Sequence, residues 1–168
     1  MAKRSLLKEL EKQESAELLR LLEEISRRFP VAEMYLRMEF GFEPEPIIEK
    51  YRKALTKEYF PSRGRGKARV SRSEKILKEF ALVSAFPEDL LEMHWFHLNL
   101  SLRYHFAIGH EYEPFIRGIF RTWEKILDHS REMGQLAACA EKLEAMIPDW
   151  AKKAGLYAEL MKVSGLNV

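Results

Sequence analysis

The segment PEDLLEMHWFHLNLSLRYHFAIG, residues 87–109, decides the fold class of this chain. Pro87 suits the first turn of a helix, and Gly109 suits the position just past its end. The residues between them are apolar nearly all round at the helical period, which is typical of a helix buried on most sides. We therefore predict a helix over residues 88–108 at the centre of the core. Charged side chains such as Arg103 make it too polar to span a bilayer.

Prolines and glycines divide the rest of the chain into further helical segments. Apolar residues recur three and four positions apart between these breaks, for example after Pro44 and after Pro114. No segment alternates apolar and polar residues over the length of a strand, and the sequence has no Asn-Gly or Asp-Gly hairpin signal. We predict an all-α fold, a compact bundle-like array of about eight helices in a single domain over residues 1–168. Residues 1–43 are expected either to join it or to form a small N-terminal helical lobe.

Composition places the chain among globular cytoplasmic proteins. Its 168 residues allow one domain with its own core. Cys139 is the only cysteine, which fits a reducing compartment and excludes an intrachain disulfide. Charge interrupts the apolar residues near the N-terminus, so a secretory h-region is not expected. We expect a cytoplasmic protein with no membrane partner.

Positive charge is concentrated in the middle of the chain. Residues 50–78 contain eleven Lys or Arg and only two acidic residues, Glu58 and Glu74, so this segment carries +9 although the whole chain carries +2. The centre of the segment is a Gly-containing basic loop, expected between the fourth and fifth helices from Phe60 to Val70. The sequence Ser71-Arg72-Ser73-Glu74 then predicts a capping box at the next helix start. Such an asymmetry indicates an anionic partner.

The basic loop suits nucleic acid in particular. Arg63-Gly64-Arg65-Gly66-Lys67 places cations on a backbone that glycine leaves free to approach a ligand closely. The aromatic side chains just before it could supply a stacking surface for bases. Its Arg-Gly-Arg core is similar to an AT-hook, a minor-groove peptide that inserts arginines, but Gly66 stands where an AT-hook has proline. The loop is not a Walker loop, because Ala68 follows Gly-Lys. The candidate nucleic-acid-binding residues are Lys57, Tyr59, Phe60, Arg63, Arg65, Lys67, Arg69 and Arg72.

Two other interpretations of the loop stay open at this point. It could be a solvated connector neutralised by acidic helices of the same chain, such as Glu9/Glu11/Glu14 or Glu141/Glu144. It could also dock on an acidic protein, in an adaptor whose exposed apolar groove takes a partner helix. We expect Ser62 to Ala68 to be the most mobile internal segment, because it combines two glycines, a serine and mutually repelling charges with no apolar anchor until Val70.

The sequence favours binding over catalysis. Cys139 lies on an alanine-rich helix stripe, as a small core residue would, and no nucleophile elbow is present. His94, His97 and His105 share one helix, but no Glu-x-x-His or His-Glu-x-x-His motif accompanies them. We therefore predict no catalytic residues, no metal site and no cofactor. A metal-dependent enzyme built on these histidines is the least favoured interpretation, and the oligomeric state stays open.

Several short motifs support a family resemblance. They are Tyr59-Phe60-Pro61 before the basic loop, Ser71 opening a helix that carries Phe80, Glu113-Pro114-Phe115 at a helix start and Glu124-Lys125 beyond it. With the leucine-rich opening from Leu6 to Phe29, they resemble an uncharacterised bacterial family, domain-of-unknown-function family 6155. The resemblance covers most of the chain. It implies an all-α fold and carries no established activity.

Overall fold

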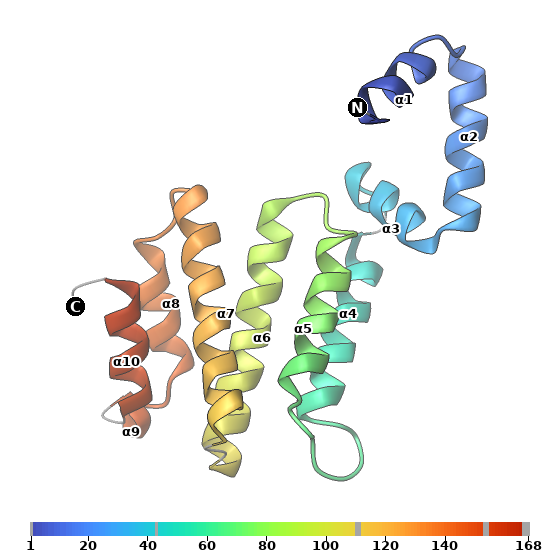
Figure 1. The fold of residues 1–168 in the computed structure, drawn as a ribbon. Helices are drawn as coiled ribbons and strands as arrows, with labels where there is room; N and C mark the ends of the chain where they lie inside the picture. Colours follow the sequence, from blue (N-terminus) through green and yellow to red (C-terminus); the bar gives the residue numbers. More distant parts are fainter. Residues whose placement is uncertain (1, 43, 110–111, 153–154, 166–168) are drawn as a thin grey trace.

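The computed structural model describes residues 2–42, 44–109, 112–152 and 155–165, which form helices and no strand. The all-α prediction is therefore confirmed, and the helix predicted over residues 88–108 is α6. Figure 1 shows the helices in chain order: α1 (Ala2–Leu10), α2 (Ser15–Arg28), α3 (Pro30–Glu39), α4 (Pro44–Tyr59), α5 (Val70–Ala81), α6 (Pro87–Ile108), α7 (Glu113–Glu132), α8 (Ala138–Met146), α9 (Asp149–Lys152) and α10 (Gly155–Ser164).

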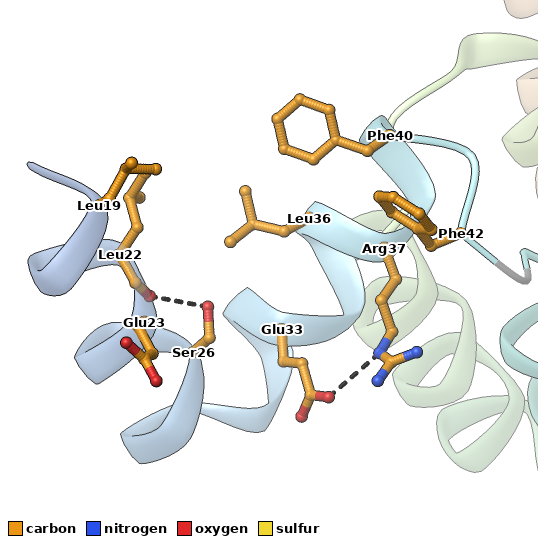
Figure 2. A pocket seen from close by; sticks show the side chains of 9 residues that line it. All are labelled: Leu19, Leu22, Glu23, Ser26, Glu33, Leu36, Arg37, Phe40 and Phe42. Carbon is orange, nitrogen blue, oxygen red and sulfur yellow. Dashed lines mark hydrogen bonds and ion pairs between the residues drawn. The ribbon is translucent and has the colours of Figure 1, made fainter. Parts of the chain in front are cut away.

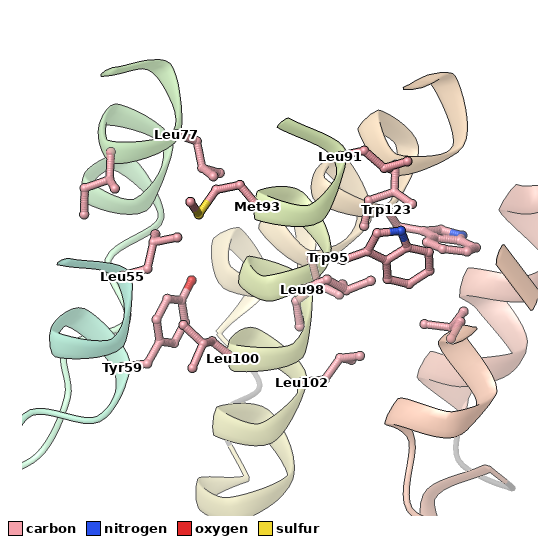
Figure 3. Packing of buried hydrophobic residues seen from close by; sticks show 14 of the residues in the cluster. Leu55, Tyr59, Leu77, Leu91, Met93, Trp95, Leu98, Leu100, Leu102 and Trp123 are labelled. Carbon is pink, nitrogen blue, oxygen red and sulfur yellow. The ribbon is translucent and has the colours of Figure 1, made fainter. Parts of the chain in front are cut away.

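Helix α6 lies at the centre of the core. It packs on α7 at one side and on α4 and α5 at the other, so opposite faces of α6 are buried against different helices. Figure 3 shows Met93 directed toward α4 and α5, whereas Trp95 is directed toward Trp123. The rings of Trp95 and Trp123 meet edge to face with their centroids 5.7 Å apart. Burial on both sides explains why the sequence of α6 is apolar nearly all round.

The C-terminal helices close the core over α7. Trp123 is fully buried, and its Nε1–H donates to the carbonyl of Leu160 in α10 at 2.8 Å. A buried indole N–H needs such an acceptor, because an unpaired donor in the core would be costly. Gly109 ends α6 in the left-handed conformation at φ +62°, as its position after the apolar run predicts. We call α4 to α10 the helical body.

Helices α1 to α3 form an N-terminal arm, residues 2–42, that projects from the end of the helical body (Figure 1). Met38 is the one buried side chain among those described in the arm. Of the fourteen large apolar side chains that are exposed in the described residues, ten lie in the arm, so it packs far less well than the body. They are Leu6, Leu7, Leu19, Leu21, Leu22, Phe29, Val31, Tyr35, Phe40 and Phe42.

Among the described residues, no helix combines the length and the apolar character that crossing a bilayer would require.

Candidate functional site

The basic loop and its flanking helices enclose a groove of about 400 Å³. The end of α4 forms one wall, the start of α5 forms another, and the loop folds over between them. Six cationic side chains line this space, together with the single carboxylate of Glu58. We call it the basic groove, and its cations are Lys57, Arg63, Arg65, Lys67, Arg69 and Arg72.

Glu58 anchors the returning half of the loop. Its nearly buried carboxylate accepts two hydrogen bonds from the Arg69 guanidinium, from Nε at 2.8 Å and from Nη2 at 2.9 Å. The backbone N–H of Arg69 donates to the same carboxylate at 3.0 Å. These hydrogen bonds, together with the positive charges of Arg69 and Arg72, hold the pKa of Glu58 below its usual range despite its burial. Glu58 therefore remains an anion and fixes Arg69 in place.

The backbone of Glu58 holds the loop as well. Its carbonyl accepts hydrogen bonds from the N–H groups of Lys67 at 3.0 Å and Ala68 at 3.1 Å. Ala68 is buried, with its backbone at φ +45°, a left-handed conformation that is uncommon outside glycine. This turn directs the chain into α5, which begins at Val70. The expectation of no apolar anchor before Val70 is therefore wrong, because the Ala68 methyl group is such an anchor.

Gly66 lets the loop lie against the end of α4. A Cβ atom placed on Gly66 would stand 1.8 Å from the carbonyl oxygen of Tyr59, so only glycine fits without a backbone shift. On the other side, the Tyr104 hydroxyl of α6 donates to the Gly66 carbonyl at 2.7 Å. The loop thus has an anchored half, residues 66–69, and an exposed half, residues 62–65.

The predicted capping box is not formed. Helix α5 begins at Val70 with Arg69 as its N-cap residue and no side-chain cap. Glu74 instead pairs with Arg121 of α7 at 3.1 Å, and the Ser73 hydroxyl donates to the Tyr59 hydroxyl at 3.2 Å. The helix thus begins before Ser71, the predicted N-cap residue, and Glu74 of the predicted box pairs with α7 instead.

Most cations of the basic groove form no ion pair with the part of the chain that the structure describes. Lys57, Arg63, Arg65, Lys67 and Arg72 form no ion pair with any residue that the structure describes, whereas Arg69 pairs with Glu58. In Figure 1 the basic loop lies at the end of α4 and α5 opposite to the arm, away from the acidic residues of α1 and α2. The arm carboxylate Glu9 pairs with its neighbour Lys12 at 2.7 Å.

Tyr59 is a core residue, which corrects its assignment as a stacking platform. It is 2% exposed, and its ring packs against His97, Tyr104 and Phe115. Phe60 is partly buried: its ring meets Tyr104 at 5.9 Å between centroids, and the Arg103 guanidinium lies 5.3 Å from its centroid. The Arg103 guanidinium therefore covers one face of the Phe60 ring.

His97 belongs to a buried polar chain that joins α4, α6 and α7. The Thr122 hydroxyl donates to the Gly118 carbonyl at 2.9 Å, so it accepts from Nδ1–H of His97 at 3.1 Å. Nε2 of His97 then accepts from the Tyr59 hydroxyl at 2.7 Å. Burial lowers the pKa of His97 to about 3, so the imidazole is neutral and both nitrogens are used within the protein.

His94 is also buried and neutral. Its Nδ1–H donates to the Leu90 carbonyl at 2.8 Å, and burial lowers its pKa to about 4. The described residues contain no cluster of three or more His, Cys, Asp or Glu side chains that could hold a metal ion. His94 and His97 are both packed into the core, at 4% exposure each.

Sequence reasoning found the groove cations but missed the residues that position them. Glu58 was visible only as one of two acids in a basic segment, and the signal was that a carboxylate among eleven cations would pair with one of them. Nothing local identified Arg69 as that partner. The Tyr104 contact with Gly66 joins residues 38 positions apart and had no local signal at all.

No curated protein and no solved structure matches this chain. The family of unknown function DUF6155 matches residues 1–155, as the motifs around the basic loop predict, and the chain belongs to this family.

Proposed function

We propose that this protein binds the sugar-phosphate backbone of nucleic acids through the basic groove. One observation carries the proposal: the groove gathers six cations, and five of them lack an ion pair with any described residue. Unpaired cations around a concave surface raise the local concentration of a polyanion and release its counterions on binding. The fold supplies a rigid wall, because Glu58 and Gly66 hold the anchored half of the loop.

The contacts are proposed to be with phosphates rather than with bases. Tyr59 is buried, Arg103 lies over the Phe60 ring, and the described lining of the groove includes no aromatic side chain. Phosphate contacts position a protein without reading sequence. We therefore expect micromolar or weaker binding at physiological salt, with little preference between sequences or between single strands and duplexes. Phe60→Ala should have no selective effect on single strands.

Fluorescence anisotropy with labelled single-stranded and duplex DNA and RNA tests the proposal. The informative variant replaces Arg63, Arg65, Lys67 and Arg72 with Gln, and it spares Arg69 because that side chain anchors the loop. The matched control removes the same total charge elsewhere on the surface, by replacing Lys8, Lys125, Arg131 and Lys162 with Gln.

The groove variant should lose at least about tenfold in affinity at low salt, because each lost phosphate contact removes counterion release. The control variant should bind like the wild type. Absence of binding to every nucleic acid at low salt would contradict the proposal. Binding to a polyglutamate peptide in that case would identify an acidic protein surface as the ligand of the same groove.

A further inference from the structure

The concave surfaces of the described residues differ in whether their charges are paired. The groove between α2 and α3 of the arm has a volume of about 590 Å³, and leucines and phenylalanines such as Leu36 and Phe40 line it. Figure 2 shows that Arg37 and Glu33 beside this groove pair with each other, at 3.1 Å. In the basic groove, by contrast, five of the six cations have no ion pair with any described residue. The basic groove therefore concentrates unbalanced charge in a small space.

The charge of the basic groove is high for its size. Its lining carries six cations and one carboxylate, so the net charge is 6 − 1 = +5 around a volume of about 400 Å³. The carboxylate, Glu58, is already paired with Arg69 at 2.8 Å, which leaves the other five cations unbalanced. Like charges around one groove repel one another, and an anion that enters relieves this repulsion. The best-matched ligand therefore brings several negative charges into the groove itself.

The rest of the lining favours a chain of phosphates that carries neither sugars nor bases. It consists of Ala54, Pro61, Gly66 and Ile76, so the described lining offers no aromatic face for a base. A nucleic acid carries a sugar and a base for every phosphate, so its backbone meets these cations mainly from outside, along the exposed half of the loop. In a condensed phosphate chain, consecutive phosphorus atoms share one bridging oxygen, and each unit is anionic. Several consecutive units are therefore compact enough to enter the groove together.

We infer that the basic groove binds inorganic polyphosphate, a linear chain of phosphates joined by anhydride bonds. The arginines without an ion pair, Arg63, Arg65 and Arg72, can each donate two hydrogen bonds to phosphate oxygens, and the two lysines act as compact point charges. Glu58 and Gly66 hold the anchored half of the loop, so part of the groove is formed before the ligand arrives. This inference goes beyond the proposed function and does not depend on it, because it requires no contact with nucleic acid.

Isothermal titration calorimetry at low salt, with long-chain inorganic polyphosphate and with tripolyphosphate, tests the inference. At equal phosphate concentration the long chain should bind the wild type at least about tenfold more tightly, because tripolyphosphate is too short to engage all five cations. The variant that replaces Arg63, Arg65, Lys67 and Arg72 with Gln should lose at least about tenfold in affinity for the long chain. The matched surface variant described above should bind like the wild type. Thermal unfolding should find the groove variant at least as stable as the wild type, because mutually repelling charges are removed.

Competition separates this inference from the proposed function. Long-chain polyphosphate should displace labelled DNA from the wild type in fluorescence anisotropy, since both ligands need the same cations. Binding of DNA without binding of polyphosphate would overturn this inference and leave the proposed function standing. Binding of polyphosphate without binding of any nucleic acid would support this inference and contradict the proposed function. Polyphosphate binding that the groove variant retains, or tripolyphosphate that binds as tightly as the long chain, would also overturn the inference.

Discussion

The basic groove and the N-terminal arm leave opposite kinds of group unpartnered. In the groove, hydrogen bonds hold the backbone of the anchored half of the loop, but five cations have no ion pair with any described residue. In the arm, charged side chains pair locally, as in Lys12 with Glu9 and Arg28 with Glu24, while leucines and phenylalanines stay exposed. The first surface suits a polyanion, and the second suits an apolar surface with interspersed charge.

This difference predicts a strong response to salt in the groove and a weak one in the arm. Binding that releases counterions weakens steeply as salt rises. Association through apolar side chains depends on buried area and is much less sensitive to ionic strength. The two surfaces can therefore be tested separately in one protein.

The largest expected effect separates the helical body from the arm. Leu98 is fully buried in α6, so Leu98→Ala should lower the free energy of unfolding by about 2–5 kcal/mol. Leu22→Ala in the arm should change the stability of the single chain by less than about 0.5 kcal/mol, because the side chain is already half exposed. Urea unfolding at low protein concentration measures both values. A large loss for Leu22→Ala under those conditions would mean that the arm packs on its own body.

The second effect is acid destabilisation confined to the helical body. The pKa values of His94 and His97 in the folded protein are about 4 and about 3, whereas an unfolded histidine has a pKa of 6.5. As the pH falls below 6.5, the unfolded chain therefore binds two protons that the folded chain does not bind. The stability contribution of each histidine is complete above pH 6.5 and is lost as the pH falls from there toward the folded pKa. Between pH 7.5 and 5.5 the free energy of unfolding should fall by about 1.3 kcal/mol per histidine, about 2.5 kcal/mol in total.

Replacing His97 with Gln keeps a donor and an acceptor at this position and should roughly halve the pH dependence. The arm contains no histidine, so this pH dependence should come from the helical body. An unfolding free energy that stays constant from pH 7.5 to 5.5 would contradict the burial of both imidazoles.

The third effect distinguishes anchored from free cations in the loop. Arg69→Ala should cost about 1–2 kcal/mol of stability, because it leaves the nearly buried Glu58 carboxylate with a backbone donor only. Arg65→Ala should cost almost nothing, since Arg65 is exposed and unpaired among the described residues.

In limited proteolysis, trypsin should cut the wild type first after Arg63 or Arg65, and Arg69→Ala should add cleavage after Lys67. First cleavage after Lys67 in the wild type would contradict the anchored half of the loop.

The fold was predictable because its signals are local. Pro87 and Gly109 mark the ends of α6, and the apolar period between them is a property of consecutive residues. The groove cations were predictable for the same reason, since charge density can be read from sequence. The sequence did not predict that these cations line one concave space, because that arrangement depends on how the loop folds back on α4.

The errors arose where distant residues replaced local partners. Tyr59 looked available for stacking because it borders a basic loop. Its side chain is instead buried, and its hydroxyl donates a hydrogen bond to Nε2 of His97 in α6. The capping box of Ser71 and Glu74 looked complete, but α5 begins at Val70 and Glu74 pairs with Arg121. Propensity and motif describe the local structure that a segment favours on its own. At these two places, tertiary contacts overrode that local preference.

The most direct test of the central claim is the salt dependence of nucleic-acid binding. Some four to six phosphate contacts in the basic groove predict a slope of about −3 to −5 in a plot of log association constant against log salt concentration. The variant that replaces Arg63, Arg65, Lys67 and Arg72 should flatten this slope toward zero, while the matched surface variant keeps the wild-type slope. A wild-type slope near zero, or an equal slope in the groove variant, would show that these cations do not meet phosphates.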